Sequence, residues 1–174
     1  PNFDADSDIS NKIFMHIYSH LYSIVFPPSL QKINSYSMGG CTYLNQIQFL
    51  KDDNNENFLR SIGDNAFTDT KIESIIIPDH IENIGSNCFP KTLKTIEFEN
   101  GCPLLNNLGK RTFSNTQIEK IALPKNVRPF IDSNSFLMCR NLKDIIFDQY
   151  QNDEEELDQE ELDENYCSLM LGQS

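Results

Sequence analysis

The feature that most constrains this chain is a short pattern that recurs about every 23 residues. In a clear copy, residues 62–67, isoleucine is followed by glycine, two further residues, a small residue and a phenylalanine. Each copy ends on a large apolar anchor, and the six anchors are Phe14, Met38, Phe67, Phe89, Phe113 and Phe136. Repetition at a nearly fixed period is typical of units that stack on one another. The pattern therefore predicts a repeat solenoid.

A second block follows each anchor and has the composition of a short strand. Residues 72–77 show its form, in which a leucine or isoleucine precedes Ile-x-Ile, Ile-x-Phe or Ile-x-Leu. Apolar residues at alternate positions, rich in β-branched and aromatic types, favour a strand. Proline follows this block at Pro27, Pro78 and Pro124. Because proline has no N–H for a ladder, we expect the strand to stop there.

Two further positions fit a tightly wound coil. The residue after the first isoleucine is of a type that tolerates positive φ, so we expect a sharp turn there. These residues are Asn34, Gly63, Gly85, Gly109 and Asp132. A small residue precedes each anchor and should let adjacent coils approach one another. The small residues are Ser37, Ala66, Cys88, Thr112 and Ser135.

A unit of about 23 residues cannot bury its own apolar face, and a pair of helices needs about 34. A coil of strand and turn fits this length. We therefore predict that residues 1–147 form a solenoid of about six coils, with short parallel strands, turns and little helix. The polar insertions after Phe49 and Phe98 are interpreted as loops on one side of a coil.

The frame Ile-Gly-x-x-Ala-Phe, followed by Leu-x-x-Ile-x-Ile-Pro, resembles the BspA-like leucine-rich repeat family. Cys41 and Cys139 stand three residues after their anchors, where that family often has cysteine, and Gly40 with Cys41 matches its Gly-Cys pair. The resemblance covers residues 9–147. It implies a right-handed solenoid with a parallel sheet on one face. It also implies a surface or secreted binding protein linked to adhesion.

Strand alternation places Ile75 and Ile77 inward and Ser74 and Ile76 outward. Applied to every coil, this rule gives two outward rows across the sheet. One row is Ser23, Gln46, Ser74, Thr95, Lys120 and Asp144, and the other is Val25, Gln48, Ile76, Glu97, Ala122 and Ile146. All of these except Ser23 and Val25 are our candidate binding residues. The rows are either a contact surface for a protein or glycan or an ordinary solvated sheet face.

The five cysteines show no Cys-x-x-Cys spacing, which argues against a zinc site. Cys41, Cys88 and Cys139 fall at positions that the repeat keeps small, so they are interpreted as core residues. Cys102 lies in an insertion and Cys167 near the C-terminus, and both are interpreted as exposed thiols.

The histidines do not indicate a metal site. His16 and His20 are four residues apart, as two ligands on one helix face would be, but the sequence shows no third ligand. His80 lies in a predicted turn without an evident partner. No phosphate-binding loop, Gly-x-Ser-x-Gly or His-Glu-x-x-His motif occurs either. We therefore predict no catalytic activity and no cofactor.

The acidic charge is concentrated at one end. The formal net charge is −12, yet ten of the 26 acidic residues lie between Asp148 and Glu164, after the last of the 14 basic residues. We expect residues 148–174 to form an acidic tail without a core, which either attracts basic partners or only solubilises the chain. The charge argues against nucleic acid as a partner, and no apolar run is long enough to span a membrane.

Three hypotheses follow. The first is a cell-surface or secreted, adhesin-like protein that binds a protein or glycan. The second is an intracellular scaffold in the cytoplasm whose acidic tail recruits basic partners, and the absence of any Asn-x-Ser/Thr sequon slightly favours it. The third and weakest is a fragment of a hydrolase whose triad is assembled by the fold.

Overall fold

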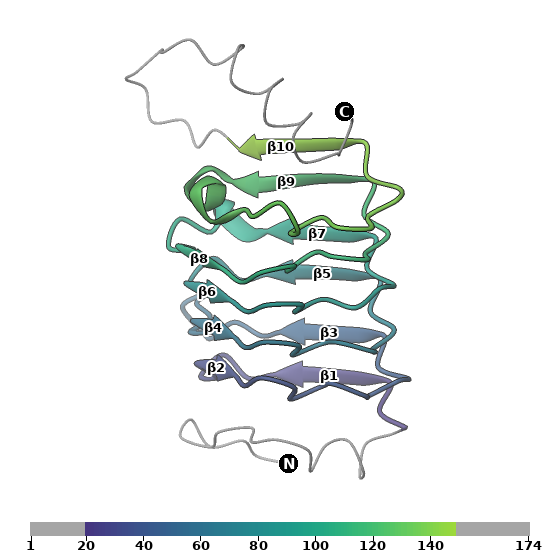
Figure 1. Ribbon diagram of the computed structural model, residues 1–174. Coiled ribbons are helices and arrows are strands. Elements are labelled where there is room, and N and C mark those ends of the chain that lie inside the picture. Colours follow the sequence, from purple (N-terminus) through teal and green to yellow (C-terminus); the bar gives the residue numbers. More distant parts are fainter. Residues whose placement is uncertain (1–19, 149–174) are drawn as a thin grey trace, which may run out of the picture.

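The computed structural model describes residues 20–148, and these residues wind into a parallel β-solenoid of about five coils (Figure 1). The six long strands lie one above the other, and about five full coils connect the first of them to the last. We call the surface they form the front face. Its strands are β1 (Ser23–Phe26), β3 (Gln46–Phe49), β5 (Ser74–Ile77), β7 (Thr95–Phe98), β9 (Lys120–Pro124) and β10 (Asp144–Asp148). The repeat solenoid predicted from the sequence is thus confirmed.

A second, narrower sheet runs along the opposite side of the coils and is continuous. Its strands are β2 (Lys32–Ile33), β4 (Ser61–Ile62), β6 (Asn83–Ile84) and β8 (Asn107–Leu108), paired in that order and all parallel. We call it the back sheet. Two short 3₁₀ turns complete the described elements, η1 (Glu99–Gly101) and η2 (Lys125–Phe130). The expectation of little helix is therefore confirmed.

The core lies between the front face and the back sheet and is built from the repeated positions. The anchors Phe67 and Phe113 are fully buried, and the rings of Phe113 and Phe136 stack with their centroids 5.2 Å apart. The small residues that precede the anchors, namely Ser37, Ala66, Cys88, Thr112 and Ser135, are all buried. Their size is therefore required by packing, as the sequence predicts.

The glycines of the repeat have a different role from the one expected. Gly63, Gly85 and Gly109 do not adopt positive φ. In the same turns, the residue with positive φ stands two positions later, for example Asn65 and Asn87. A Cβ at Gly63 would overlap the backbone of Asn34 and Ser35 in the preceding coil, and the other two glycines meet the same obstacle. Glycine is required because the backbones of successive coils come very close there.

The front face is interrupted where the back sheet is not. Its long strands pair as β1 with β3, β5 with β7 and β9 with β10, and within residues 20–148 no strand pairing joins β3 to β5 or β7 to β9. Figure 1 shows the wider spacing between β3 and β5. We call this unpaired interval the β3–β5 gap.

A proline stands at each of the two interruptions. In the β1–β3 pair, the residue that follows β3 donates to the coil before it, since Leu50 N bonds to the carbonyl oxygen of Phe26 at 3.0 Å. The equivalent positions in the coils of β5 and β9 are Pro78 and Pro124, which have no N–H to donate. Each proline thus withholds one hydrogen bond from the ladder between its own coil and the coil before it.

The sequence predictions for the two ends stay predictions. The first anchor, Phe14, and residues 149–174 lie outside the described residues. The last described coil is less enclosed than the others, since Leu142, Ile145 and Phe147 are only half-buried.

We expect the β3–β5 gap to be visible in amide hydrogen exchange. By the alternation of a parallel ladder, the N–H groups of Ile47 and Phe49 point into the gap, whereas that of Gln48 points to β1. The first two amides should exchange at least about tenfold faster than that of Gln48. Exchange resolved by NMR measures this, and equal protection of all three would contradict the interruption.

Truncation of a stacked anchor should be costly. Phe113→Ala should lower the free energy of unfolding by about 3–5 kcal/mol, because the ring is fully buried between Phe89 and Phe136. Lys120→Ala, at an exposed position, should change it by less than about 0.5 kcal/mol. Urea denaturation measures both, and comparable losses at the two positions would contradict the packing described.

Candidate functional site

The two outward rows predicted from the sequence lie on the front face. Their members are exposed, with the exception of Ala122, which is half-buried beside the fully buried Leu123. Ile76 is 56% exposed and Ile146 is 40% exposed, as expected for apolar residues that point away from the core. The fold therefore brings the ten candidate binding residues onto one surface, and their role in binding stays a prediction.

A groove lies on this surface over β1, β3 and β5, and we call it the front groove. Its volume is about 810 Å³, within the range typical of ligand sites. The polar side chains that line it are mostly uncharged: Ser23, Asn45, Gln46, Gln48, Ser74 and Thr92. Lys71 and Glu73 also contribute, with opposite charges.

A second cavity of about 480 Å³ adjoins the front groove along the β3–β5 gap. Both cavities reach Ile47, and the second also reaches Phe49 and Leu50. Ile47 and Phe49 are inward residues of β3, yet they are only partly buried, whereas the equivalent residues of β1, β5 and β7 are buried. The partly buried side chain of Ile47 therefore gives the front groove an apolar patch on its floor.

Two exposed tyrosines stand beside one end of the front groove. Tyr22 is 58% exposed and Tyr43 is 49% exposed, and their ring centroids lie 5.6 Å apart. The ring of His20 stacks on that of Tyr43 at 5.8 Å. Asn45, which lines the groove, donates from its backbone N–H to the carbonyl oxygen of Tyr22 at 3.0 Å. Sequence reasoning missed this pair, although each tyrosine shortly precedes a predicted strand in consecutive coils.

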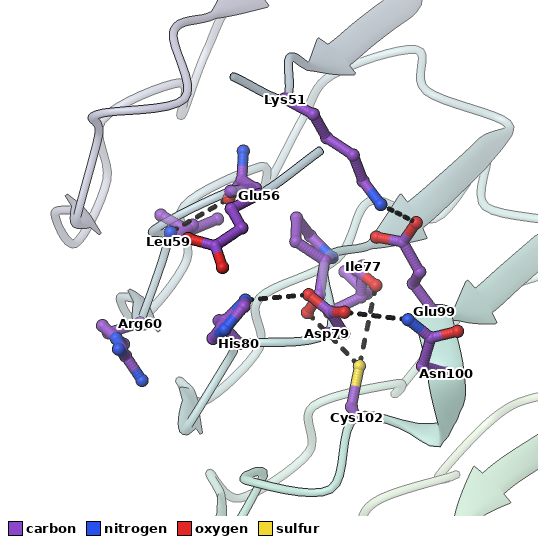
Figure 2. A network of polar contacts seen from close by, with 12 residues as sticks. Lys51, Glu56, Leu59, Arg60, Ile77, Asp79, His80, Glu99, Asn100 and Cys102 are labelled. Carbon is purple, nitrogen blue, oxygen red and sulfur yellow. Dashed lines mark hydrogen bonds and ion pairs between the residues drawn. The ribbon is translucent and has the colours of Figure 1, made fainter. Parts of the chain in front are cut away.

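A polar network joins the two loop insertions at another edge of the solenoid (Figure 2). Lys51, in the first insertion, forms an ion pair of 2.5 Å with Glu99 at the start of the second. Asn100 donates to the carboxylate of Asp79 at 2.8 Å. Nδ1 of His80 lies 2.9 Å from the same carboxylate without the geometry of a hydrogen bond. The network ties the coils of β3, β5 and β7 together at this edge.

The network shifts the pKa values of two of its members, Lys51 and Asp79. The hydrogen bond to Glu99 raises the pKa of Lys51 above its usual value. Burial alone would raise the pKa of Asp79, but the hydrogen bond from Asn100 and the nearby charges of His80 and Lys51 outweigh it. The pKa of Asp79 therefore lies below its usual value, and the carboxylate is held in its charged form.

Cys102 is a buried residue of this network, and its interpretation as an exposed thiol is wrong. Its sulfur donates to the carbonyl oxygen of Pro78 at 3.3 Å, and burial raises the pKa of the thiol to about 12. A thiol held in this way is protonated at neutral pH and is a poor nucleophile. Although Asp79 and His80 are near, the arrangement does not favour a Cys-His-Asp site.

The other cysteines follow the repeat. Cys41 and Cys88 are buried, as predicted, and burial raises the pKa of both thiols. Cys139 is only half-buried, because it lies in the less enclosed last coil, and its sulfur contacts the carbonyl oxygen of Phe113 at 2.9 Å. Cys167 and His16 lie outside the described residues. Within residues 20–148, no three His, Cys, Asp or Glu side chains gather as a metal site would require.

Charged residues concentrate on the half of the front face towards the C-terminus. The outward rows there contain Glu97, Lys120 and Asp144, and ion pairs bridge neighbouring coils beside them, such as Lys143 with Glu119 at 2.9 Å. The outward positions of β1, β3 and β5 contain no charged residue. The front face is therefore divided into an uncharged and a charged half. In the part of the chain that the structure describes, no helix has the length and apolarity to cross a membrane.

The family model for the BspA-type leucine-rich repeat region matches residues 7–143 with six copies. Among curated protein sequences, none matches this chain significantly.

Two solved structures share the fold. The pneumococcal vaccine antigen PcpA is 30% identical, with a TM-score of 0.65 over 74% of this chain and 31% of that one. A leucine-rich cell surface protein from Faecalibacterium prausnitzii is 20% identical, with a TM-score of 0.54 over 79% of this chain and 42% of that one. This chain thus spans less than half the length of either protein.

We expect the charge on Asp79 to stabilise the fold in a pH-dependent manner. Asp79→Asn keeps an acceptor oxygen but removes the charge, so it should lower the free energy of unfolding by about 0.5–1 kcal/mol at pH 7. Because the pKa of Asp79 is lowered by folding, its contribution is present above the unfolded value, near 3.8, and is lost as the pH falls through the folded value.

The wild type and Asp79→Asn should therefore differ at pH 7, and the difference should shrink as the pH falls from 3.8 through the lower pKa of folded Asp79. Urea denaturation at a series of pH values measures the difference. A difference that stays constant down to pH 2 would show that the charge is not responsible.

Proposed function

This chain belongs to the BspA-type leucine-rich repeat family, and we propose that it is a non-catalytic binding protein whose front face contacts a protein or glycan ligand. The observation that carries the proposal is the front groove, which lies across three coils on an exposed, parallel-stranded surface. Solenoids commonly use such an extended surface for recognition. The candidate contact residues are the outward rows, above all Gln46, Gln48, Ser74 and Ile76.

A surface or secreted location is part of the proposal. It is supported by the fold shared with a vaccine antigen and a cell surface protein, as their names describe them. Such a location suits an adhesin-like role. The alternative is a cytoplasmic scaffold, which would use the acidic residues between Asp148 and Glu164 to recruit basic partners.

Location separates these two proposals. Intact source cells are treated with a membrane-impermeant protease, and the chain is then detected by immunoblot beside a cytosolic marker. Loss of the chain with survival of the marker supports the surface protein. Survival of both supports the scaffold.

Binding by the front face is tested with beads that carry the purified chain, on surfaces coated with mucin or with fibronectin. We expect retention on at least one coating. Gln48→Arg combined with Ile76→Arg should reduce retention at least about fivefold, because two bulky charges then stand on the front face.

The matched control is Asn54→Arg combined with Asn106→Arg, which adds the same charge at exposed positions outside the front strands. It should leave retention unchanged. No retention on either coating, or equal retention of both variants, would contradict binding by the front face.

A further inference from the structure

The front groove differs chemically from the rest of the front face. Asn45, Gln46 and Gln48 present amide groups, and Ser74 and Thr92 present hydroxyls. Amides and hydroxyls both donate and accept hydrogen bonds without a net charge. The charges at its edge oppose one another, since Lys71 and Glu73 have opposite signs and Glu73 is already paired with Lys94 at 2.8 Å. The groove thus favours an uncharged ligand rich in hydroxyl groups.

The two tyrosines add a flat apolar surface beside the amides. The ring of Tyr43 contacts those of Tyr22 and His20, and about half of each tyrosine side chain stays exposed. An aromatic ring offers a face for stacking against the C–H groups of another ring. A sugar ring has such a C–H face and a rim of hydroxyls, so it matches a tyrosine placed beside amide side chains.

The β3–β5 gap supplies further hydrogen-bonding groups. The N–H groups of Ile47 and Phe49 point toward β5 but have no partner strand there. Backbone groups that are withdrawn from a ladder need water or a ligand as partner. A hydroxyl can meet both donors and acceptors of this kind.

The same gap does not suit an added peptide strand. The back sheet pairs β2 with β4 without interruption, and Lys71 N donates to the carbonyl oxygen of Leu44 at 2.7 Å beside the gap. These bonds hold the two coils together, whereas a third strand would need a further spacing of about 4.8 Å. A small hydroxyl group enters where a polypeptide backbone does not.

We propose that the front groove binds an uncharged oligosaccharide. One sugar ring stacks on Tyr22 or Tyr43, and the hydroxyls of the following rings bond with Asn45, Gln46 and Gln48. This proposal rests on the proposed function of the front face and specifies the ligand class of its uncharged half.

The test is isothermal titration calorimetry of the full chain with defined probes. The uncharged probes are maltohexaose, cellohexaose, hexa-N-acetylchitohexaose and lacto-N-tetraose, and the charged comparison is a hyaluronan octasaccharide. We expect saturable binding of at least one uncharged probe and weaker or no binding of hyaluronan. No binding of the uncharged probes, or a preference for hyaluronan, would overturn the proposal.

Variants locate the site. Gln46→Ala and Tyr43→Ala should each weaken binding of the same probe about tenfold, because each removes a direct contact. Tyr36→Ala is the matched control, since Tyr36 is 52% exposed but lies in a turn outside the front strands. It should change the affinity less than twofold. Equal losses for Tyr43→Ala and Tyr36→Ala would overturn the assignment to the front groove.

The outcome also separates this proposal from the broader one. If the charged pair Gln48→Arg and Ile76→Arg abolishes bead retention on fibronectin while no uncharged probe binds, the front face recognises a protein. The saccharide proposal then fails and the proposed function stands. If beads are not retained on any coating and no probe binds, both fail.

Discussion

The close approach of successive coils at the back sheet is the constraint on which the rest of the structure depends. Gly63, Gly85 and Gly109 place backbone against backbone, each directly after a short strand, and the short strands pair without a break from β2 to β8. This continuous contact sets the stacking of the coils. The front face lacks pairing at two of its interfaces, and the coil that follows each of them has a proline, Pro78 or Pro124, at a position that could otherwise donate.

The unpaired β3–β5 gap lacks the backbone hydrogen bonds of a ladder, and two cavities lie along it. Ile47 and Phe49 have the spacing of core residues and yet line the cavities beside the β3–β5 gap, whereas the inward residues of β7, beside the other interruption, stay buried. Across the same coils, Lys51 and Glu99 join the insertions at another edge, and Asn100 holds Asp79. Neighbouring coils are therefore joined by hydrogen bonds at the back sheet and by polar side chains at the insertion edge, whereas β3 and β5 of the front face are not paired.

Much of this fold follows from the sequence, because an assignment made for one position of the repeat applies to the same position in every other copy. The alternation that places Ile75 inward and Ile76 outward in one strand holds for the others, and the small residue before each anchor is buried wherever it is described. The sequence predictions were wrong where the environment of a residue is set by the neighbouring coil. The glycines are explained by a backbone in the preceding coil, and Cys102 is buried by a loop that closes over carbonyl groups of the coil before it.

The candidate site was harder to predict for the same reason. Gln46 and Gln48 could be placed on the front face by alternation alone. The tyrosine pair and the apolar patch on the groove floor depend on how two coils lie side by side, which no single repeat encodes. Pro78 was interpreted only as the end of its own strand. The hydrogen bond that it cannot donate would have run to the preceding coil, so its effect appears beside β3 and could not be read from one repeat. In a stacked repeat, a residue that cannot donate withholds a hydrogen bond from the neighbouring coil, and at Pro78 that neighbour is β3, the strand that carries Gln46 and Gln48.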